Sequence, residues 1–400
     1  MGKFENISRV YKGLLLRNRA FASFRDDETG LIYDDIIKHI KPGEWILDPM
    51  SGYGGGMLYF GKQGYRTFNI ELNPPAFYWQ ILMNPGNKGK ILGFIDKIQF
   101  HSNQVPKIAE NFSITDDLFS TIAINHIKNL YEFILNLVNE KETTISIILP
   151  FVSRFANYQR SVTNITHFKQ GGFCSFIGWE IDFEEYLVGL KELLSKTEEN
   201  ELEHINKQSN IFEFEPEDNK FDFFVTSPPY PNYRDYSKLF KMENWILDNL
   251  FNLNKTDFNQ MIGSNNVSGK KYGLIESETA KKFLNELLEK SKKLAKKSRY
   301  DVEVYYHPYF SLYFYDMQEA YKKLNTMLTD KAIGYIVVND NITRDISVPV
   351  GKSICDIFSS IGFETENYDE KQISHYGNIG KSAKRINSRH TRHILKVWKK

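Results

Sequence analysis

The stretch WILDPMSGYGGG, residues 45–56, decides the fold class of this chain. It opens with the apolar run Trp45-Ile46-Leu47, typical of a buried strand, and continues into a glycine-rich turn. Met57 to Gln63 then shows a helical pattern. Glycines let a backbone turn sharply and approach a ligand closely, as in nucleotide-binding strand-turn-helix units. The stretch therefore predicts an α/β fold with a ligand-binding turn, and a merely flexible loop is the alternative.

A second predicted strand follows at the spacing that such a unit requires. Thr67 to Ile70 reads as a strand and ends in Glu71. In nucleotide-binding folds, an acidic residue about 20 residues after the glycine turn receives ribose hydroxyls. Strand, glycine turn, helix and acid-ended strand occur here in that order, which favours a binding site over a surface glutamate.

The other informative motif is Thr226-Ser227-Pro228-Pro229-Tyr230, which follows the apolar run Phe221 to Val225. Proline has a fixed φ and no N–H, and it keeps the preceding residue out of helical space. We therefore expect a stiff, extended turn whose carbonyls face outward, unpaired, and accept hydrogen bonds from an amine. Enzymes that act on a base commonly flip it out and stack it on an aromatic ring, which Tyr230 would supply. An ordinary loop is the alternative.

Together these motifs resemble a known family. Asp48 to Gly54 resembles the DP-x-SG-x-G cofactor loop, and Thr226 to Tyr230 resembles the TSPPY motif, of the S-adenosylmethionine-dependent DNA amino-methyltransferases of restriction-modification systems. The resemblance implies an α/β, Rossmann-like class I methyltransferase with a mostly parallel seven-stranded sheet. Helical or irregular insertions would form its target-recognition region. The implied activity is methylation of cytosine N4 or adenine N6 in double-stranded DNA, with S-adenosylmethionine as cofactor.

Weaker matches extend over much of the remaining chain. Tyr309 to Met317 precedes a predicted helix, and Lys331 to Asp340 looks like the strand that follows it in this family. Gly362-Phe363 and Arg392 to Val397 look like the closing hairpin. The resemblance implies that the cofactor is bound by Asp48, Pro49, Ser51, Gly52, Gly54, Glu71, Asn73, Thr226 and, in the segment 24–29, Phe24.

The chain departs from the family pattern around the cofactor. Tyr53 stands where relatives often have Ser, and Gly55-Gly56 replace a Thr-rich continuation. The residue that would contact the cofactor adenine has two candidate places. One is Asn103, after a predicted strand at 98–100, and the other is Asn210 or Glu213, just before the catalytic strand. The usual order in this subtype favours the second place.

The resemblance assigns catalysis to Ser227, Pro228, Pro229 and Tyr230. Ser227 and the Pro228 carbonyl would hold the target amine so that its nitrogen faces the methyl sulfonium for a direct in-line transfer. Positioning supplies most of the rate in such a scheme. Ser at position 227 is typical of cytosine N4 enzymes, whereas many adenine enzymes carry Asp or Asn there. The sequence thus favours cytosine, with adenine N6 as the alternative.

Length predicts large insertions. The chain has 400 residues, whereas a methyltransferase core needs only about 200 to 250. We divide it into residues 1–103 and 309–400 as the two halves of the core and 206–240 as the catalytic strand and motif. Residues 104–205 and 241–308 are insertions and candidate DNA-recognition regions. Helices are predicted at Ile122 to Val138 and Thr279 to Ser298, and a strand at Thr144 to Leu149.

Candidate DNA contacts combine basic, aromatic and amide side chains, which offer phosphate, stacking and base-edge interactions. The formal net charge is only +1, yet eight Lys or Arg residues and no acid occur from Lys381 to Lys400, which indicates a basic edge beside the active site. The candidates are Arg154, Asn157, Tyr158, Arg160, Tyr233, Arg234, Lys384, Arg385 and Arg389.

Other chemistries have less support. Carbon-5 cytosine methylation needs a nucleophilic Cys, usually after Pro, but Cys174 follows Phe173 and Cys355 follows Ile354. Two distant Cys and nine scattered His favour neither disulfides nor a metal site. No apolar run approaches membrane length, so we expect a cytoplasmic protein. We also expect a monomer or weak dimer. Its partners would be double-stranded DNA and, functionally, a cognate restriction endonuclease. Methylation of RNA or a protein amide, or a non-enzymatic DNA-binding module, remain alternatives.

Overall fold

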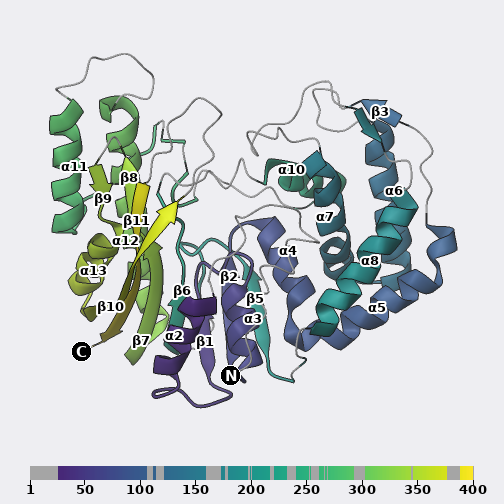
Figure 1. Ribbon diagram of the computed structural model, residues 1–400, viewed down its shortest axis with the longest axis horizontal. Coiled ribbons are helices and arrows are strands. Elements are labelled where there is room, and N and C mark those ends of the chain that lie inside the picture. The colour runs from purple at the N-terminus through teal and green to yellow at the C-terminus, as the bar shows by residue number, and fades with distance from the viewer. Residues whose placement is uncertain are drawn as a thin grey trace.

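The computed structural model describes most of the chain, and its seven-stranded sheet forms the centre (Figure 1). The described residues are 26–105, 111–113, 121–158, 173–175, 179–196, 199, 201–216, 220–231, 240–251, 253, 261–264, 266–267, 269–291, 302–343, 346–375 and 388–399. The strand order is β10-β11-β7-β6-β1-β2-β5. The strands are β1 (Trp45–Asp48), β2 (Arg66–Glu71), β5 (His204–Gln208), β6 (Phe221–Thr226), β7 (Leu328–Asn339), β10 (Phe363–His375) and β11 (Ser388–Lys399).

Five neighbouring strands of this sheet are parallel. β5, β2, β1, β6 and β7 all run in one direction. β11 is antiparallel to both β7 and β10, so the last two strands form a hairpin at one edge. The α/β class and the mostly parallel seven-stranded sheet are therefore confirmed. The predicted strands at Lys331 to Asp340 and Arg392 to Val397 correspond to β7 and β11.

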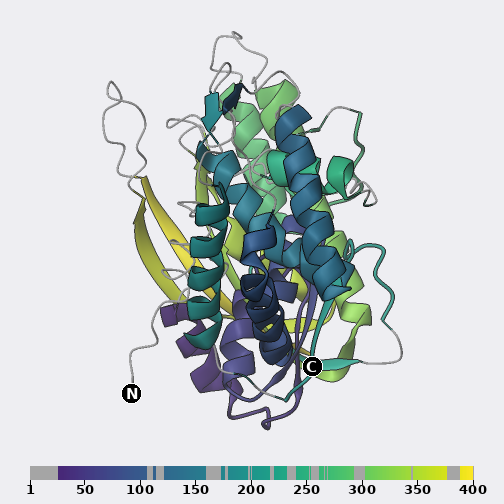
Figure 2. The same cartoon turned by 90° about the vertical axis from the view of Figure 1, so that its right-hand side faces the viewer.

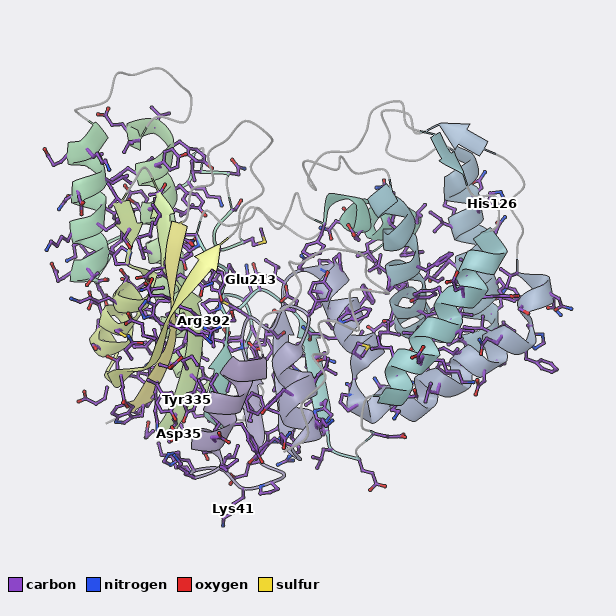
Figure 3. The ribbon with its side chains drawn as sticks, viewed as in Figure 1. Asp35, Lys41, His126, Glu213, Tyr335 and Arg392 are labelled. Carbon is purple, nitrogen blue, oxygen red and sulfur yellow. The ribbon has the colours of Figure 1, made fainter. Side chains whose placement is uncertain are left out.

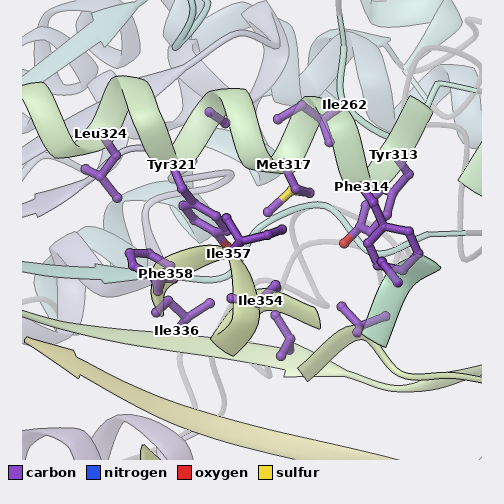
Figure 4. Close-up of a cluster of buried hydrophobic side chains, with 14 of the residues drawn as sticks. Ile262, Tyr313, Phe314, Met317, Tyr321, Leu324, Ile336, Ile354, Ile357 and Phe358 are labelled. Atoms are coloured by element: carbon purple, nitrogen blue, oxygen red, sulfur yellow. The ribbon is translucent and has the colours of Figure 1, made fainter. Parts of the chain in front are cut away.

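Helices cover both faces of the sheet because alternate strand residues point to opposite sides. On β6, Phe224 faces α12 and α13, whereas Phe223 and Val225 face α2 and α3. Helix α12 lays a row of apolar side chains over β7 and α13, as Figure 4 shows. These helices are α2 (Asp26–Ile36), α3 (Gly55–Lys62), α11 (Glu278–Ser291), α12 (His307–Thr326) and α13 (Val350–Ser360).

One glycine permits the tight contact between strand and helix on this face. The ring of Phe224 lies directly over Gly334 of β7, where an added Cβ would come within 1.9 Å of the ring. Phe224 stacks on Phe358 of α13 with ring centroids 6.1 Å apart. Any side chain at position 334 would displace that ring from the core.

A helical layer packs beyond the β5 edge, on the right of Figure 1 and in front of the sheet in Figure 2. It has its own apolar core, to which the glycine loop contributes Tyr53. The layer draws on residues before position 104 as well as on both segments 104–205 and 241–308. Its helices are α4 (Pro74–Met83), α5 (Lys88–Phe100), α6 (Thr121–Val138), α7 (Lys141–Tyr158), α8 (Trp179–Lys196) and α10 (Lys241–Leu250).

Smaller elements connect these parts. Two short strand pairs are β3 (Asn111–Ser113) with β4 (Phe173–Ser175), and β8 (Asn341–Thr343) with β9 (Ile346–Val348). Short helical turns span η2 (Pro85–Asn87), η3 (Ser102–Gln104) and the π-helical η5 (Val302–Tyr306), which leads into α12.

Three predicted elements were wrong. Thr144 to Leu149 is part of helix α7, and residues 98–100 are the last turn of α5 rather than a strand. Tyr309 to Met317 lies within α12, not before a helix. The run from Ile145 to Phe151 is buried almost throughout in the helical layer, and a short apolar run cannot be assigned to strand or helix by periodicity alone. The predicted helix at Thr279 to Ser298 is confirmed as far as Ser291, and 292–298 lie outside the described residues.

Candidate functional site

The two sequence motifs lie at the same edge of the sheet. β1 is the neighbour of both β2 and β6, with Asp48 opposite Asn69 and Leu47 opposite Phe224. Because all three strands are parallel, the glycine loop, Glu71 and the Thr226 to Tyr230 motif all follow their carboxyl ends. Ligands of open α/β sheets bind at this edge.

The glycine loop is held back against β2. Ser51 donates hydrogen bonds to the Ile70 carbonyl from its backbone N–H, at 3.0 Å, and from its hydroxyl, at 3.1 Å. Gly54 is the N-cap residue just before helix α3, with φ 73°, and a Cβ there would lie 3.0 Å from the side chain of Gln80. The left-handed conformation and the lack of space both require glycine at this position.

Gln80 of α4 fixes the loop from the other side, and sequence reasoning missed it. Its side chain is fully buried, and Nε2 donates to the Ser51 hydroxyl at 2.8 Å and to the Gly52 carbonyl. Its Oε1 has no hydrogen-bond partner in the described part of the chain. A lone polar residue in the apolar helix sequence PPAFYWQILM was the available signal.

Tyr53 of the glycine loop has a structural role. Its ring is 8% exposed and meets Trp79 edge-on, with centroids 6.3 Å apart. The ring of Phe240, just before α10, lies 5.9 Å away on a tilted plane. Tyr53 therefore anchors the loop in the core of the helical layer, which explains a large aromatic residue at this position.

Glu71 closes the loop at the end of β2. Its two carboxylate oxygens accept hydrogen bonds from the N–H groups of Gly52, at 2.6 Å, and Asn73, at 2.7 Å. Burial raises the pKa of Glu71 to about 7; these two hydrogen bonds oppose that rise, and the nearby Asp48 carboxylate adds to it. Each carboxylate oxygen has a second lone pair, so Glu71 can still accept from a ligand hydroxyl.

Asp48 is more deeply buried, with 3% of its surface exposed. Burial raises its pKa to about 7, and the Thr226 hydroxyl and the Met50 N–H lower it in part. The Met50 N–H lies 3.3 Å from Oδ1. Asn73 Oδ1, beside these residues, is buried and has no hydrogen-bond partner within the described ranges. Buried acceptors without donors suit a ligand that brings cationic or hydroxyl groups.

The turn after β6 partly corrects the expectation of outward, unpaired carbonyls. The Pro229 carbonyl accepts a hydrogen bond from the Tyr313 hydroxyl of α12 at 3.1 Å. The Pro231 carbonyl accepts one from the Asn341 side chain. These donors reach the turn because α12 and β8 pack beside it. The Pro228 carbonyl has no such partner among the described residues.

Ser227 and Tyr230 contact each other within this turn. Their hydroxyl oxygens are 2.8 Å apart, and the Tyr230 hydroxyl also lies 3.3 Å from the carbonyl oxygen of Val337 on β7. Both side chains are partly exposed. Spacing in the sequence gave no indication of this contact.

The candidates for adenine contact separate clearly. Asn103 is exposed in η3 after α5, in the helical layer, because residues 98–100 are helical rather than a strand. Asn210 follows β5, the strand that pairs with β2, and is 6% exposed. Its Oδ1 accepts from the Phe212 N–H at 3.2 Å, and Glu213 is exposed just beyond (Figure 3). The candidate place just before β6 is thus the one at the carboxyl edge of the sheet.

The basic residues of β11 lie partly at the end of the sheet that carries the motifs and partly toward its other end. Arg392 pairs with Asn339 at the edge that carries the motifs, whereas Trp398 pairs with Ile333 toward the other edge. Lys396 is bound to Asp35, and Lys399 donates to the Leu328 carbonyl at 3.4 Å. Lys396 and Lys399 therefore do not contribute to a basic edge beside the site, contrary to the expectation for the whole run from Lys381 to Lys400.

Most candidate DNA contacts, and one cofactor contact, cannot be placed. Phe24, Arg160, Tyr233, Arg234, Lys384 and Arg385 lie outside the described residues. The backbones of Arg154, Asn157 and Tyr158 lie in α7 and that of Arg389 in β11, but their side chains are outside the described part.

Comparison with protein-family models, with curated proteins and with solved structures finds no match for this chain. Among the described residues, no helix has the length and apolar character needed to cross a bilayer. Nor does any group of at least three His, Cys, Asp or Glu side chains in the described ranges have an arrangement that could hold a metal ion.

Proposed function

We propose that this protein transfers a methyl group from S-adenosylmethionine to the exocyclic amine of cytosine (N4) in a specific double-stranded DNA sequence. The observation that carries the proposal is the adjacency of β2, β1 and β6, which gathers Glu71, Asp48 and Ser227 at one sheet edge. The resemblance of both motifs to DNA amino-methyltransferases supplies the substrate class. By the same resemblance the modification would protect DNA from a cognate restriction endonuclease.

The residues of the edge fit S-adenosylmethionine. Asp48 is buried and Glu71 half-buried, both with raised pKa values, and the buried Asn73 Oδ1 beside them lacks a donor in the described part of the chain. A ligand with an ammonium group, a sulfonium group and two ribose hydroxyls supplies the missing charge and donors. Glu71 would accept from the ribose hydroxyls, while Asp48 and the glycine loop would hold the methionine part.

Bound there, the cofactor supplies a methyl group on an electron-deficient sulfur. The chain positions the acceptor nitrogen: Ser227 and the Pro228 carbonyl accept the two amine hydrogens, and the Tyr230 ring offers a stacking face. Holding the nitrogen in line is enough, because its proton can leave after the methyl group has been taken up. Such positioning lowers the barrier without a strong base.

Expression in a methylation-free bacterial host tests the proposal. Single-molecule sequencing of host DNA, with mass spectrometry of its nucleosides, is expected to show N4-methylcytosine in one short motif. N6-methyladenine would keep the mechanism but change the base. Ser227→Ala is expected to abolish the mark, whereas Ser353→Ala, which removes a buried hydroxyl bonded to the Pro349 carbonyl in α13, keeps it. Unmodified DNA would overturn the proposal and direct the search to RNA or protein substrates.

A further inference from the structure

We infer that the Tyr230 hydroxyl and the Val337 carbonyl together turn the hydrogen of Ser227 away from the target base. Ser227 then meets the base only as a hydrogen-bond acceptor and selects an amine over a carbonyl. Tyr230 is thus a positioning residue that acts through Ser227, in addition to offering its ring. This inference rests on the proposed function, of which it specifies the substrate discrimination.

The argument begins with the number of hydrogens available. The Tyr230 oxygen lies 2.8 Å from the Ser227 oxygen and 3.3 Å from the Val337 carbonyl oxygen. A carbonyl can only accept, and a tyrosine hydroxyl has one hydrogen. Both contacts are hydrogen bonds only if Tyr230 donates to Val337 and accepts from Ser227. The Ser227 hydrogen is then committed, and its lone pairs remain for a ligand.

The position of Val337 makes this arrangement rigid. Val337 lies in β7, where it is 1% exposed and pairs with Ile394 of β11. β7 is also the parallel neighbour of β6, from which the turn begins. Pro228 and Pro229 limit the backbone of that turn. The acceptor is therefore part of the sheet, and the hydroxyl pair has little freedom to reverse its direction.

An acceptor at this position distinguishes bases by their exocyclic group. The amine of cytosine or adenine donates a hydrogen bond to the Ser227 oxygen. The carbonyl oxygen of uracil or hypoxanthine can only accept, so two acceptors would face each other with no hydrogen between them. A site built to bond one partner strongly rejects an analogue that leaves its polar group unpaired. A serine free to rotate would instead donate to the carbonyl and lose this selection.

The variant Tyr230→Phe tests the role of the hydroxyl separately from that of the ring. The ring keeps its stacking face, but Ser227 loses its acceptor and can turn its hydrogen to the base. The probe is a labelled duplex that contains the methylated motif found by sequencing. A second duplex carries uracil in place of the target cytosine, or hypoxanthine if the target is adenine. Both carry an abasic site opposite the target, so that the ease of flipping is equal.

Fluorescence anisotropy gives the affinity ratio of the amine and carbonyl duplexes. We expect a ratio of about 10 or more for the wild-type protein, falling to about 2 in Tyr230→Phe, since only the wild-type protein leaves a buried polar group unpaired against the carbonyl. Tyr313→Phe is the matched control: it removes a hydroxyl that bonds the same turn, but at the Pro229 carbonyl. Its ratio should equal that of the wild-type protein.

A double mutant shows whether Tyr230 acts through Ser227. In a Ser227→Ala background, Tyr230→Phe should change the ratio no further. With an active wild-type enzyme, kcat should also fall about tenfold in Tyr230→Phe while the KM for DNA changes little. A wild-type ratio in a folded Tyr230→Phe protein, or a further fall in the Ser227→Ala background, would overturn the inference alone. A wild-type protein that methylates no DNA would overturn the proposed function as well.

Discussion

Gln80 Nε2 donates a hydrogen bond to the Ser51 hydroxyl at 2.8 Å and so joins the helical layer to the glycine loop. The same nitrogen donates to the Gly52 carbonyl. Gln80→Leu keeps most of the volume but removes both bonds. We expect a loss of about 2 kcal/mol in the free energy of unfolding, from two buried hydrogen bonds. Because the loop loosens, S-adenosylmethionine should bind about tenfold more weakly in calorimetry.

Gln318→Leu provides the control for this prediction. Gln318 of α12 is also buried, and it bonds the Leu274 carbonyl and the Glu276 N–H away from the glycine loop. It should lose comparable stability in urea denaturation yet bind the cofactor as the wild-type protein does. Equal cofactor affinity in both variants would show that Gln80 has no special role in the loop.

The anchoring of Tyr53 gives a second prediction. Tyr53→Ser introduces the residue that members of the resembled methyltransferase family often carry but leaves a cavity beside Trp79 and Phe240. We expect a destabilisation of about 3 kcal/mol, the usual range for truncating a buried aromatic residue. Tyr53→Phe keeps both ring contacts and should retain most of the stability. Thermal unfolding followed by circular dichroism compares the two, and equal melting temperatures would contradict an anchoring role.

The sequence predicted which residues lie at the carboxyl edge of the sheet better than it predicted the side-chain contacts between separate elements there. Asp48, Glu71 and Ser227 could be brought together because each ends a recognisable strand, and parallel strands present their carboxyl ends at one edge. Gln80 could not be assigned, because its contact with Ser51 depends on how α4 packs against the loop. The Ser227 to Tyr230 contact likewise depends on a carbonyl of β7, more than 100 positions away.

The helical layer was the least predictable part of the fold. The run from Thr144 to Leu149 was predicted as a strand, and its β-branched residues do favour strands. In the structure it is buried among helices, where tertiary packing outweighs that preference. The same applies to residues 98–100, whose assignment to a strand made Asn103 a candidate cofactor contact.

A third prediction concerns the buried ion pair on the α2 face of the sheet, where Asp35 and Tyr335 lie close together in Figure 3. Burial alone would raise the pKa of Asp35, but hydrogen bonds from Lys396, Tyr335 and Lys38 outweigh it and hold that pKa well below its usual range. The Tyr335 hydroxyl donates to Asp35 at 2.6 Å. These contacts join α2 to β7 and β11.

Lys396 and Lys38 contact the same carboxylate but differ in burial, with side chains 16% and 63% exposed. Lys396→Met should lower the free energy of unfolding at pH 7 by about 2 kcal/mol, because it weakens a buried pair. Lys38→Met should change it little, as for exposed pairs. The lowered pKa stabilises the fold above about pH 4, so the Lys396→Met difference should shrink in acid. Equal effects of the two variants in urea denaturation would contradict the argument.

The fourth prediction is that the charged forms of Asp48 and Glu71 destabilise the ligand-free fold, and that cofactor binding offsets this destabilisation. Asp48 and Glu71 have pKa values raised to about 7 by burial. Between about pH 4 and pH 7 the folded, ligand-free protein therefore holds more protons than the unfolded chain, and its stability falls as the pH rises. Above pH 7 both states have lost these protons, so the decline levels off. Binding of the cofactor should strengthen over the same interval, because both carboxylates become charged.

Asp48→Asn tests this directly, because an amide has the same shape but no charge. At pH 8 the variant should be more stable than the wild-type protein by up to about 4 kcal/mol, given about 1.4 kcal/mol per unit of pKa shift. At pH 4, where Asp48 is protonated, the two should differ little. Calorimetry should detect no S-adenosylmethionine binding by the variant at either pH. A variant that is more stable but no longer binds the cofactor would show that the Asp48 carboxylate serves ligand binding rather than folding. A variant less stable at pH 8 would show that Asp48 is a structural residue.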